Sequence, residues 1–399
     1  MNTVLMIGIV LAVAILGELV AEKLKLPVVV GYVVFGVLFG KSVIGVFSAD
    51  FINNTAIIND FALGLMAFTI GAELKKSLFV KLGKSIFFIV FFEASLAFVF
   101  VTLTMYFLNP DKLYQAIILG AMASATAPAA TIAVIQQYKA KGPLTSTILA
   151  VVGIDDAMSL IIFAFAATFA KSLMSGAHLS IIKVIVHPVI EISIALALGI
   201  SFAFLSNIFF KKIRNPEKLS IRVAAVIAIL LGLSNLLDVS ELLSIMAYAA
   251  TLVNINPILT NRSTGIVKHF EPIFYALFFI LAGANLDLSL FKTIGLMGLF
   301  YTLARGLGKY AGGSIGATLG KAPLKVRKYV GLGLLPQLGV AVGLAIVVNK
   351  IFGMGDYGEA GKMLSKIVLN ILLFTTIITE IVGPLLTRYA IIKAGEQNN

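Results

Sequence analysis

Long runs of apolar residues alternate with short polar connections along the whole chain. Most runs have about the 20 residues that an α-helix needs to cross the hydrocarbon core of a bilayer. Thirteen such segments can be recognised, and each predicts a membrane-spanning helix. Their approximate ranges are 3–22, 27–46, 55–75, 84–108, 112–138, 143–170, 181–210, 219–237, 240–257, 271–288, 291–319, 327–351 and 363–391. The pattern predicts an all-α polytopic membrane protein.

Composition agrees with this pattern, because 59% of the residues are hydrophobic and only 13% are charged. Such values exclude a soluble globular protein. The net charge of +12 is spread over short connections, so we expect no nucleic-acid partner. The apolar start, Val4 to Leu16, lacks a basic leader and a cleavage site, which favours a first helix over a signal peptide. The sequence has no cysteine and no nucleophile or metal-ligand pattern, so we expect neither an enzyme nor a bound cofactor.

The connections indicate an orientation and a repeat. Lys and Arg concentrate in every second connection, starting with the one after the first segment, which predicts an outside N-terminus and a cytoplasmic C-terminus. The stretch Gly71-Ala72-Glu73-Leu74 recurs 212 residues later as Gly283-Ala284-Asn285-Leu286. Segments 1–6 would therefore repeat as segments 8–13, with segment 7 as a linker. The repeat is shifted by seven segments, an odd number, so the second half would cross the membrane in the opposite direction to the first. Such inverted repeats are typical of secondary transporters.

An acid pair, Asp155 and Asp156, lies inside the sixth segment. A carboxylate at the bilayer centre costs about 2.5–3.5 kcal/mol on insertion scales, so such groups usually serve a function. The alternative is a structural ion pair with a basic residue. Arg305 and Lys309 in the eleventh segment lie on one helix face. Either could pair with Asp155, and we favour Lys309 because it lies deeper in its segment.

Prolines interrupt two segments at corresponding places, Pro128 in the fifth and Pro336 in the twelfth. Proline breaks a helix, and the released backbone groups must face protein or a wet cavity. We expect two crossed broken helices whose ends face an ion, although each proline alone could mark a packing kink. Near these breaks and the acid pair, the further candidate site residues are Ser124, Gln337, Glu93 and Glu380.

Three stretches together carry a family resemblance: Thr126-Ala127-Pro128-Ala129-Ala130-Thr131, Gly153-Ile154-Asp155-Asp156-Ala157 and Gly308-Lys309. They resemble the cation:proton antiporter superfamily, most closely the bacterial sodium/proton antiporters of its second family. The likeness covers essentially the whole chain. It implies a homodimer in which a core (81–178 and 289–399) moves like an elevator against a dimerisation domain (1–80 and 216–288), with 179–215 as linker. Gly31, Gly36 and Gly40 suit close packing between protomers.

The resemblance also implies roles for single residues. Asp156 would bind the ion, Asp155 would pair with Lys309, and Thr126 would be a polar group at the helix crossing. Gln337 departs from the pattern, because many relatives have a charged residue just after the second proline. The neutralisation of the half-helix dipoles is therefore open.

These observations predict a sodium (or lithium)/proton antiporter in a prokaryotic plasma membrane. A buried carboxyl group can hold either a proton or a hard cation with oxygen ligands, here from Asp155, Asp156 and the Thr126 hydroxyl. If Asp155 turned to sodium, Lys309 would lose its partner and could release a second proton. A potassium/proton antiporter remains the alternative, although the chain lacks the nucleotide-binding tail of potassium-efflux relatives. A channel is less expected, since no selectivity-filter motif is present. An organic-anion symporter is less expected because it would not need the buried lysine beside the acid pair.

Overall fold

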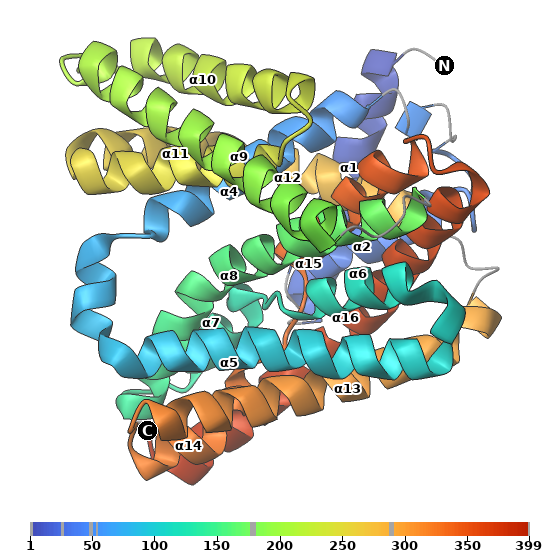
Figure 1. The fold of residues 1–399 in the computed structure, drawn as a ribbon, viewed down its shortest axis with the longest axis vertical. Coiled ribbons are helices and arrows are strands. Elements are labelled where there is room, and N and C mark those ends of the chain that lie inside the picture. The colour runs from blue at the N-terminus through green and yellow to red at the C-terminus, as the bar shows by residue number, and fades with distance from the viewer. Residues whose placement is uncertain are drawn as a thin grey trace. The chain divides into compact units, whose positions relative to one another are not determined.

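The computed structural model describes residues 3–24, 28–47, 51–52, 55–175, 181–286 and 291–397, and every regular element within them is helical (Figure 1). In these ranges seven helices are long and apolar enough to cross a membrane, or eight if one bent pair forms a single span. The chain is thus a helical, multi-pass membrane protein. The count of thirteen spans and the orientation stay predictions.

The chain divides into two compact units. The first comprises Met1–Ile52, Leu82–Ala177 and Phe279–Asn399. Its elements are α1 (Thr3–Lys23), α2 (Val28–Phe39), most of α5 (Lys76–Leu108), η1 (Pro110–Lys112), α6 (Leu113–Ala123), α7 (Pro128–Gln137), α8 (Pro143–Met174), the end of α12 (Pro257–Ala284), α13 (Phe291–Leu319), α14 (Leu324–Tyr329), η3 (Val330–Leu334), α15 (Gly339–Val348), the π-helical turn η4 (Asn349–Gly353) and α16 (Gly358–Ala394).

The second unit comprises Asn53–Lys81 and His178–Phe278. It contains α4 (Ala56–Glu73), α9 (Ile181–Phe210), α10 (Pro216–Leu236), α11 (Glu241–Ile255) and most of α12. The predicted division into core and dimerisation domains stays a prediction, and its boundary at residue 178 lies outside the described residues.

One predicted connection is helical. The tenth segment was expected to start at residue 271, but α12 begins at Pro257 and continues through Pro272. Proline suits the first position of a helix, and the Asn256 side chain accepts a hydrogen bond from the Leu259 N–H at 3.1 Å as a cap. The polar residues that suggested a loop, Arg262 and Lys268 among them, therefore lie on a helix; residues 287–288 of the predicted segment lie outside the described residues.

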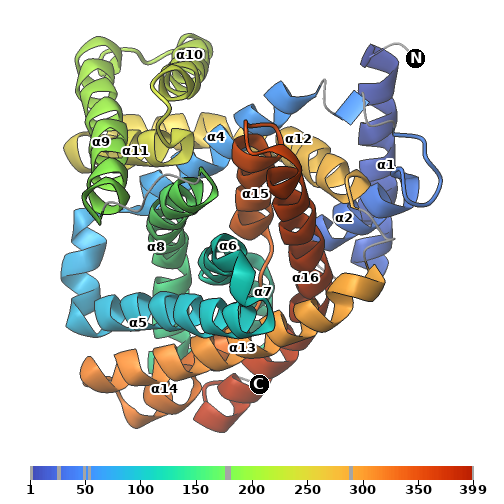
Figure 2. The ribbon, with the colours of Figure 1, turned by 45° about the vertical axis from the view of Figure 1, so that its right-hand side comes forward.

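Glycines at every fourth position of α13 bring this helix against α5, and both views show the two helices side by side (Figure 2). A Cβ atom added at Gly308 or Gly312 would lie 2.7 Å from the Cα of Ala97 or 2.5 Å from that of Glu93. Gly316 and Gly320 continue the contact. Only glycine allows backbones to approach this closely. The contact places Glu93 of α5 next to Lys309 of α13.

The helices break at the two places marked by the prolines. Helix α6 ends at Ala123 and α7 begins at Pro128. In the second break, the direction changes by 49° between Leu324–Leu334 and Gly339–Gly353. The Ala127 N–H donates to the Pro336 carbonyl at 2.9 Å, so the two breaks lie against each other.

The two copies of the predicted repeat end alike. In the second unit, the Leu74 N–H donates to the Gly71 carbonyl at 3.1 Å; in the first, Leu286 bonds to Gly283 at 3.0 Å. Gly71 packs on the backbone of α11, while Gly283 packs on that of α2. Helices α2 and α11 are themselves repeat counterparts in the predicted scheme, so the contacts are reciprocal.

The glycines of α2 are used within the chain. Gly31 packs on the Gly17 backbone of α1, Gly36 on Ile280 and Gly40 on Ala284. The prediction that these glycines contact a second protomer is therefore wrong, because a Cβ at any of them would already clash with this chain's own backbone. The glycines in the sequence indicate that α2 packs closely against another helix, but the sequence does not indicate which helix that is.

Candidate cation-binding site

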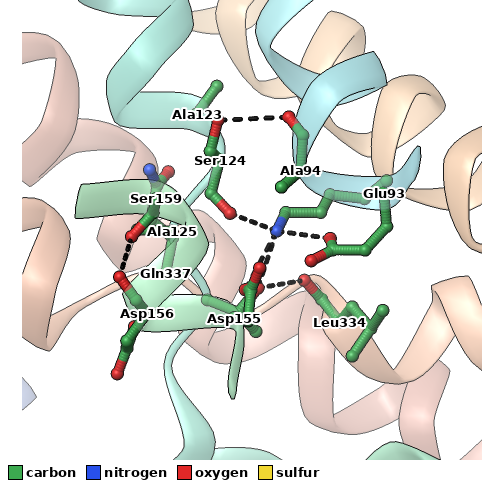
Figure 3. Close-up of polar contacts among 12 residues, drawn as sticks. Glu93, Ala94, Ala123, Ser124, Ala125, Asp155, Asp156, Ser159, Leu334 and Gln337 are labelled. Atoms are coloured by element: carbon green, nitrogen blue, oxygen red, sulfur yellow. Dashed lines mark hydrogen bonds and ion pairs between the residues drawn. The ribbon is translucent and has the colours of Figure 1, made fainter. Parts of the chain in front are cut away.

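Lys309 is the centre of a buried polar cluster in the first unit, and Figure 3 labels its partners Glu93, Ser124 and Asp155. Its Nζ lies 3.1 Å from Asp155 Oδ2 and 2.6 Å from Glu93 Oε2. It also donates to Thr126 Oγ1 at 2.8 Å and to the carbonyl of Ser124. The three N–H bonds of an ammonium group thus serve Ser124, Thr126 and Asp155, and Glu93 completes the shell at ion-pair distance.

Four elements supply this cluster: α8 carries Asp155, α5 carries Glu93, α13 carries Lys309, and the break between α6 and α7 carries Ser124 and Thr126. The Asp155, Glu93 and Lys309 side chains are fully buried. A lone ammonium group taken out of water costs several kcal/mol, and two carboxylates offset that cost. The structure therefore pairs Asp155 with Lys309, as favoured from the sequence, and adds Glu93 as a second partner.

Arg305 has a different role from the one considered for it. Its guanidinium donates to four backbone carbonyls: those of Ala123 (3.1 Å) and Ala125 (2.7 Å) in the first break, and of Leu335 (2.5 Å) and Pro336 (3.4 Å) in the second. The C-terminal end of a helix carries partial negative charge, and a nearby cation stabilises it. One buried arginine thus compensates both breaks, which explains how the neutral Gln337 is tolerated.

Gln337 ties the breaks together without contributing charge. Its Nε2 donates to the Met122 carbonyl at 2.8 Å and to the Tyr301 hydroxyl at 2.9 Å. It thus joins the second break to the end of α6 and to α13. Sequence reasoning did not identify Tyr301, which is fully buried, because the contact joins residues 36 positions apart in the chain.

Glu380 of α16 is buried, and neither of its carboxylate oxygens has a hydrogen-bond partner in the described part of the chain. The Glu380 carboxylate is near enough to the Arg305 guanidinium for the two opposite charges to attract each other. One turn further along α16, a Cβ added at Gly383 would lie 2.6 Å from Pro336 Cγ, so this helix packs on the second break. Glu380 therefore lies on a helix that packs against the second break, and it is not part of the Lys309 cluster.

Asp156 is the more accessible member of the acid pair, with a relative exposure of 9% against 0% for Asp155. Its carboxylate is directed away from the cluster around Asp155 and Glu93 (Figure 3). Its backbone carbonyl accepts a hydrogen bond from Ser159 Oγ at 2.8 Å, within α8. Adjacent helical residues diverge by about 100°, so the two acids face different surroundings.

The site carries more acidic than basic groups. Glu93, Asp155, Asp156 and Glu380 are buried together with the two bases, Arg305 and Lys309. If all were ionised, negative charge would be in excess, and desolvation would make that excess costly. A bound proton or cation would remove the cost. The described residues contain no group of three or more His, Cys, Asp or Glu side chains arranged as a metal site.

The contacts of Arg305 with the four carbonyls of the two breaks, called here the arginine clamp, lead to a prediction about stability. Arg305→Gln should lower the free energy of unfolding by about 3 kcal/mol, because hydrogen bonds to charged groups contribute about 1.5–3 kcal/mol each and the four are not additive. The measurement is thermal unfolding of purified protein in detergent. Arg214→Gln, at an exposed connection, is the matched control and should change little. Equal shifts in the two variants would contradict the clamp.

A helical membrane protein with a surplus of buried acids at two paired helix breaks has the features of a secondary ion transporter. The chain belongs to the transmembrane sodium/hydrogen exchanger family, whose sequence pattern matches residues 8–391. Membership places it among transporters and not among enzymes.

The chain also resembles individual proteins over nearly its whole length. It is 22% identical, over 388 residues and 96% of each chain, to an Enterococcus hirae protein described as a Na(+)/H(+) antiporter. Its fold matches the sodium proton antiporter MjNhaP1 of Methanocaldococcus jannaschii at pH 8, with a TM-score of 0.79, 18% identity, and coverage of 98% and 99%. A second structure of that antiporter, from electron microscopy, matches over 100% of both chains with a TM-score of 0.73 and 17% identity.

Proposed function

We propose that this protein exchanges sodium for protons across a prokaryotic plasma membrane. Family membership and the full-length similarity to an E. hirae antiporter support sodium and proton as the substrates. The observation that carries the proposal at the level of the site is the divergence of the acid pair. Lys309 engages Asp155, while the adjacent Asp156 presents its carboxylate in another direction.

Asp156 binds the transported ion in this proposal. Its carboxylate holds either a proton or a sodium ion, and sodium as a hard cation takes further oxygens from Asp155, the Thr126 hydroxyl and the carbonyls of the breaks. An empty, ionised site is costly to move through a low-dielectric barrier, whereas an occupied site is compensated. Movement only in the occupied state makes the exchange obligatory, and no cofactor is required.

Glu93 changes the expected role of Lys309. Sequence reasoning gave the lysine one partner, so departure of Asp155 toward sodium would have released its proton. With Glu93 Oε2 at 2.6 Å, the lysine keeps a second acidic side chain beside it. We therefore propose that Lys309 retains its proton and that the acidic side chains carry the transported protons. Wild type and Lys309→Gln should respond alike to an imposed membrane potential in proteoliposomes; a potential dependence lost in the variant would assign a transported proton to Lys309.

The thirteen spans, the inverted repeats, the N-outside orientation, the homodimer and the elevator movement belong to the same proposal. The dimer has no support from the α2 glycines, so it depends on the family resemblance. The cysteine-free chain allows a direct test. Single cysteines at exposed Leu5 or Leu16 of α1 should cross-link two protomers, whereas cysteines at exposed Leu303 or Leu307 of α13 should not. The reverse pattern would place the interface on the core.

Sodium is the proposed ion because each of the relatives named above is described as a sodium antiporter. The test uses purified protein in vesicles that contain a pH-sensitive dye and an imposed pH gradient, with sodium, lithium and potassium added in turn. Sodium and lithium should dissipate the gradient, and potassium should do so far less. A response to potassium alone would favour the potassium/proton alternative, and a response to none of the three would contradict cation exchange.

A further inference from the structure

The N-terminus of α8 is capped by a side chain from the end of α16. Glu396 Oε1 accepts from the Leu144 N–H, and Oε2 accepts from the Thr145 N–H and the Thr145 hydroxyl, each at 2.8 Å. The first N–H groups of a helix lack partners within the helix and carry partial positive charge. Gly142, which precedes α8, has no side chain to satisfy them. Glu396 therefore takes the place of the missing cap.

The backbone delivers Glu396 to this position with little freedom. After α16 ends, Gly395 adopts a left-handed conformation (φ 67°, ψ 34°). The N–H groups of Gly395 and Glu396 donate to the carbonyls of Ile392 (3.0 Å) and Ile391 (3.1 Å), the two bonds of a Schellman motif. The Glu396 carbonyl then accepts from the Lys141 N–H at 2.9 Å.

Further contacts hold the same turn. Lys325 Nζ donates to the Ala394 carbonyl at 2.5 Å, which ties the start of α14 to the end of α16. A Cβ added at Gly142 would lie 2.6 Å from Glu396 Cγ and Oε1, so glycine there leaves room for the carboxylate. Glu396 is 6% exposed, although it lies beyond the last helix. A buried carboxylate with three donors is a strong and specific contact.

The capped helix is the one that carries the acid pair. Asp155 lies ten residues beyond Thr145, which is about 15 Å along a helix axis. Helix α16, at whose end Glu396 lies, also carries Glu380 and packs on Pro336 through Gly383. The contact thus connects two helices that both reach the candidate site. A shift of α8 along its axis would change the distance between Asp155 and Lys309.

We propose that Glu396 is a positioning residue: a C-terminal latch that fixes α8 along its axis and so holds Asp155 and Asp156 in place for cation binding. This inference depends on the proposed function for its transport readout. It does not depend on it for the structural readout described below.

The first test measures the half-saturating sodium concentration for proton flux in proteoliposomes. Glu396→Gln keeps the shape but removes the charge, and its amide nitrogen cannot accept the Thr145 N–H. We expect the half-saturating concentration to rise about threefold to tenfold, in the range by which residues remote from a ligand alter coupling. Thr145→Val should shift it less, in the same direction, and Glu396→Asp should partly restore it. Glu359→Gln, an exposed acid paired with Lys362 at the other end of α16, should change nothing.

The second test is amide hydrogen exchange, which requires no transport. Glu396→Gln should speed exchange in the first turn of α8 and also around residues 153–157. Faster exchange confined to the first turn, with unchanged sodium dependence, would make Glu396 a local cap only and overturn the latch. If Glu396→Gln fails to fold, the sodium dependence and the hydrogen exchange of Thr145→Val test the latch in its place. Absence of proton flux in the wild type would instead count against the proposed function. The hydrogen-exchange data would still test whether Glu396 holds α8 in place.

Discussion

Replacing Asp156 with asparagine will reduce sodium-driven proton flux to the level of protein-free vesicles. The amide has nearly the same shape as the carboxyl group, but it neither carries an exchangeable acidic proton nor offers negative charge to sodium. The fold should persist, because the change removes a buried charge rather than creating one. The measurement is dye-reported flux in proteoliposomes, together with the elution volume and melting temperature of the purified variant.

Asp356→Asn is the matched control, since Asp356 is an exposed acid in the connection before α16. It should keep wild-type flux, which would show that loss of one negative charge is harmless outside the site. Full sodium-driven flux in folded Asp156→Asn protein would remove Asp156 from the mechanism. Asp155 would then be the remaining acid of the pair to test.

Truncating Lys309 to alanine will cause the largest loss of stability among the site variants. Asp155 and Glu93 would stay buried without the ammonium group that both contact, at 3.1 and 2.6 Å. Breaking a buried ion pair by removing one partner typically costs about 3–5 kcal/mol. We expect a clear fall in the melting temperature in detergent and low transport activity. Lys362→Ala, which removes an exposed lysine paired with Glu359, should cost less than about 1 kcal/mol.

A second variant separates lost charge compensation from lost packing. Adding Glu93→Gln to Lys309→Ala removes one of the two stranded acids, so the double variant should recover part of the lost stability. A lysine that mattered only for packing would give no recovery. Loss of stability no greater than in Lys362→Ala would show that the cluster has little energetic importance.

The sequence was sufficient where a feature depends on neighbouring residues. Apolar runs of membrane length predicted the helices, and Pro128 and Pro336 marked both breaks because proline disrupts a helix locally. Asp155 and Asp156 stood out because ionisable groups are rare in such runs. Lys309 could be favoured over Arg305 by its depth in the segment. Each of these inferences needed only the composition and spacing of one segment.

The remaining features depend on contacts between segments far apart in the chain. Nothing local to Glu93 indicates that Gly308 and Gly312 bring α13 onto its backbone. Four carbonyls from two separate breaks meet Arg305 only once the chain has folded. Glu396 looks like an ordinary polar residue after a final helix, because its partners lie about 250 residues earlier. The start of α12 was missed because a polar helix face resembles a loop when its neighbours are unknown.

The central claim is coupled exchange of sodium for protons, and uptake of radioactive sodium tests it most directly. Proteoliposomes with an acidic interior are diluted into a more alkaline medium that contains labelled sodium. The proposed exchange predicts that outward proton flow drives sodium inward above its external concentration, that an ionophore which collapses the pH gradient stops this accumulation, and that Asp156→Asn vesicles show none. Uptake that ignores the pH gradient would indicate a channel, and uptake that needs the opposite gradient would indicate symport; either result would contradict the account.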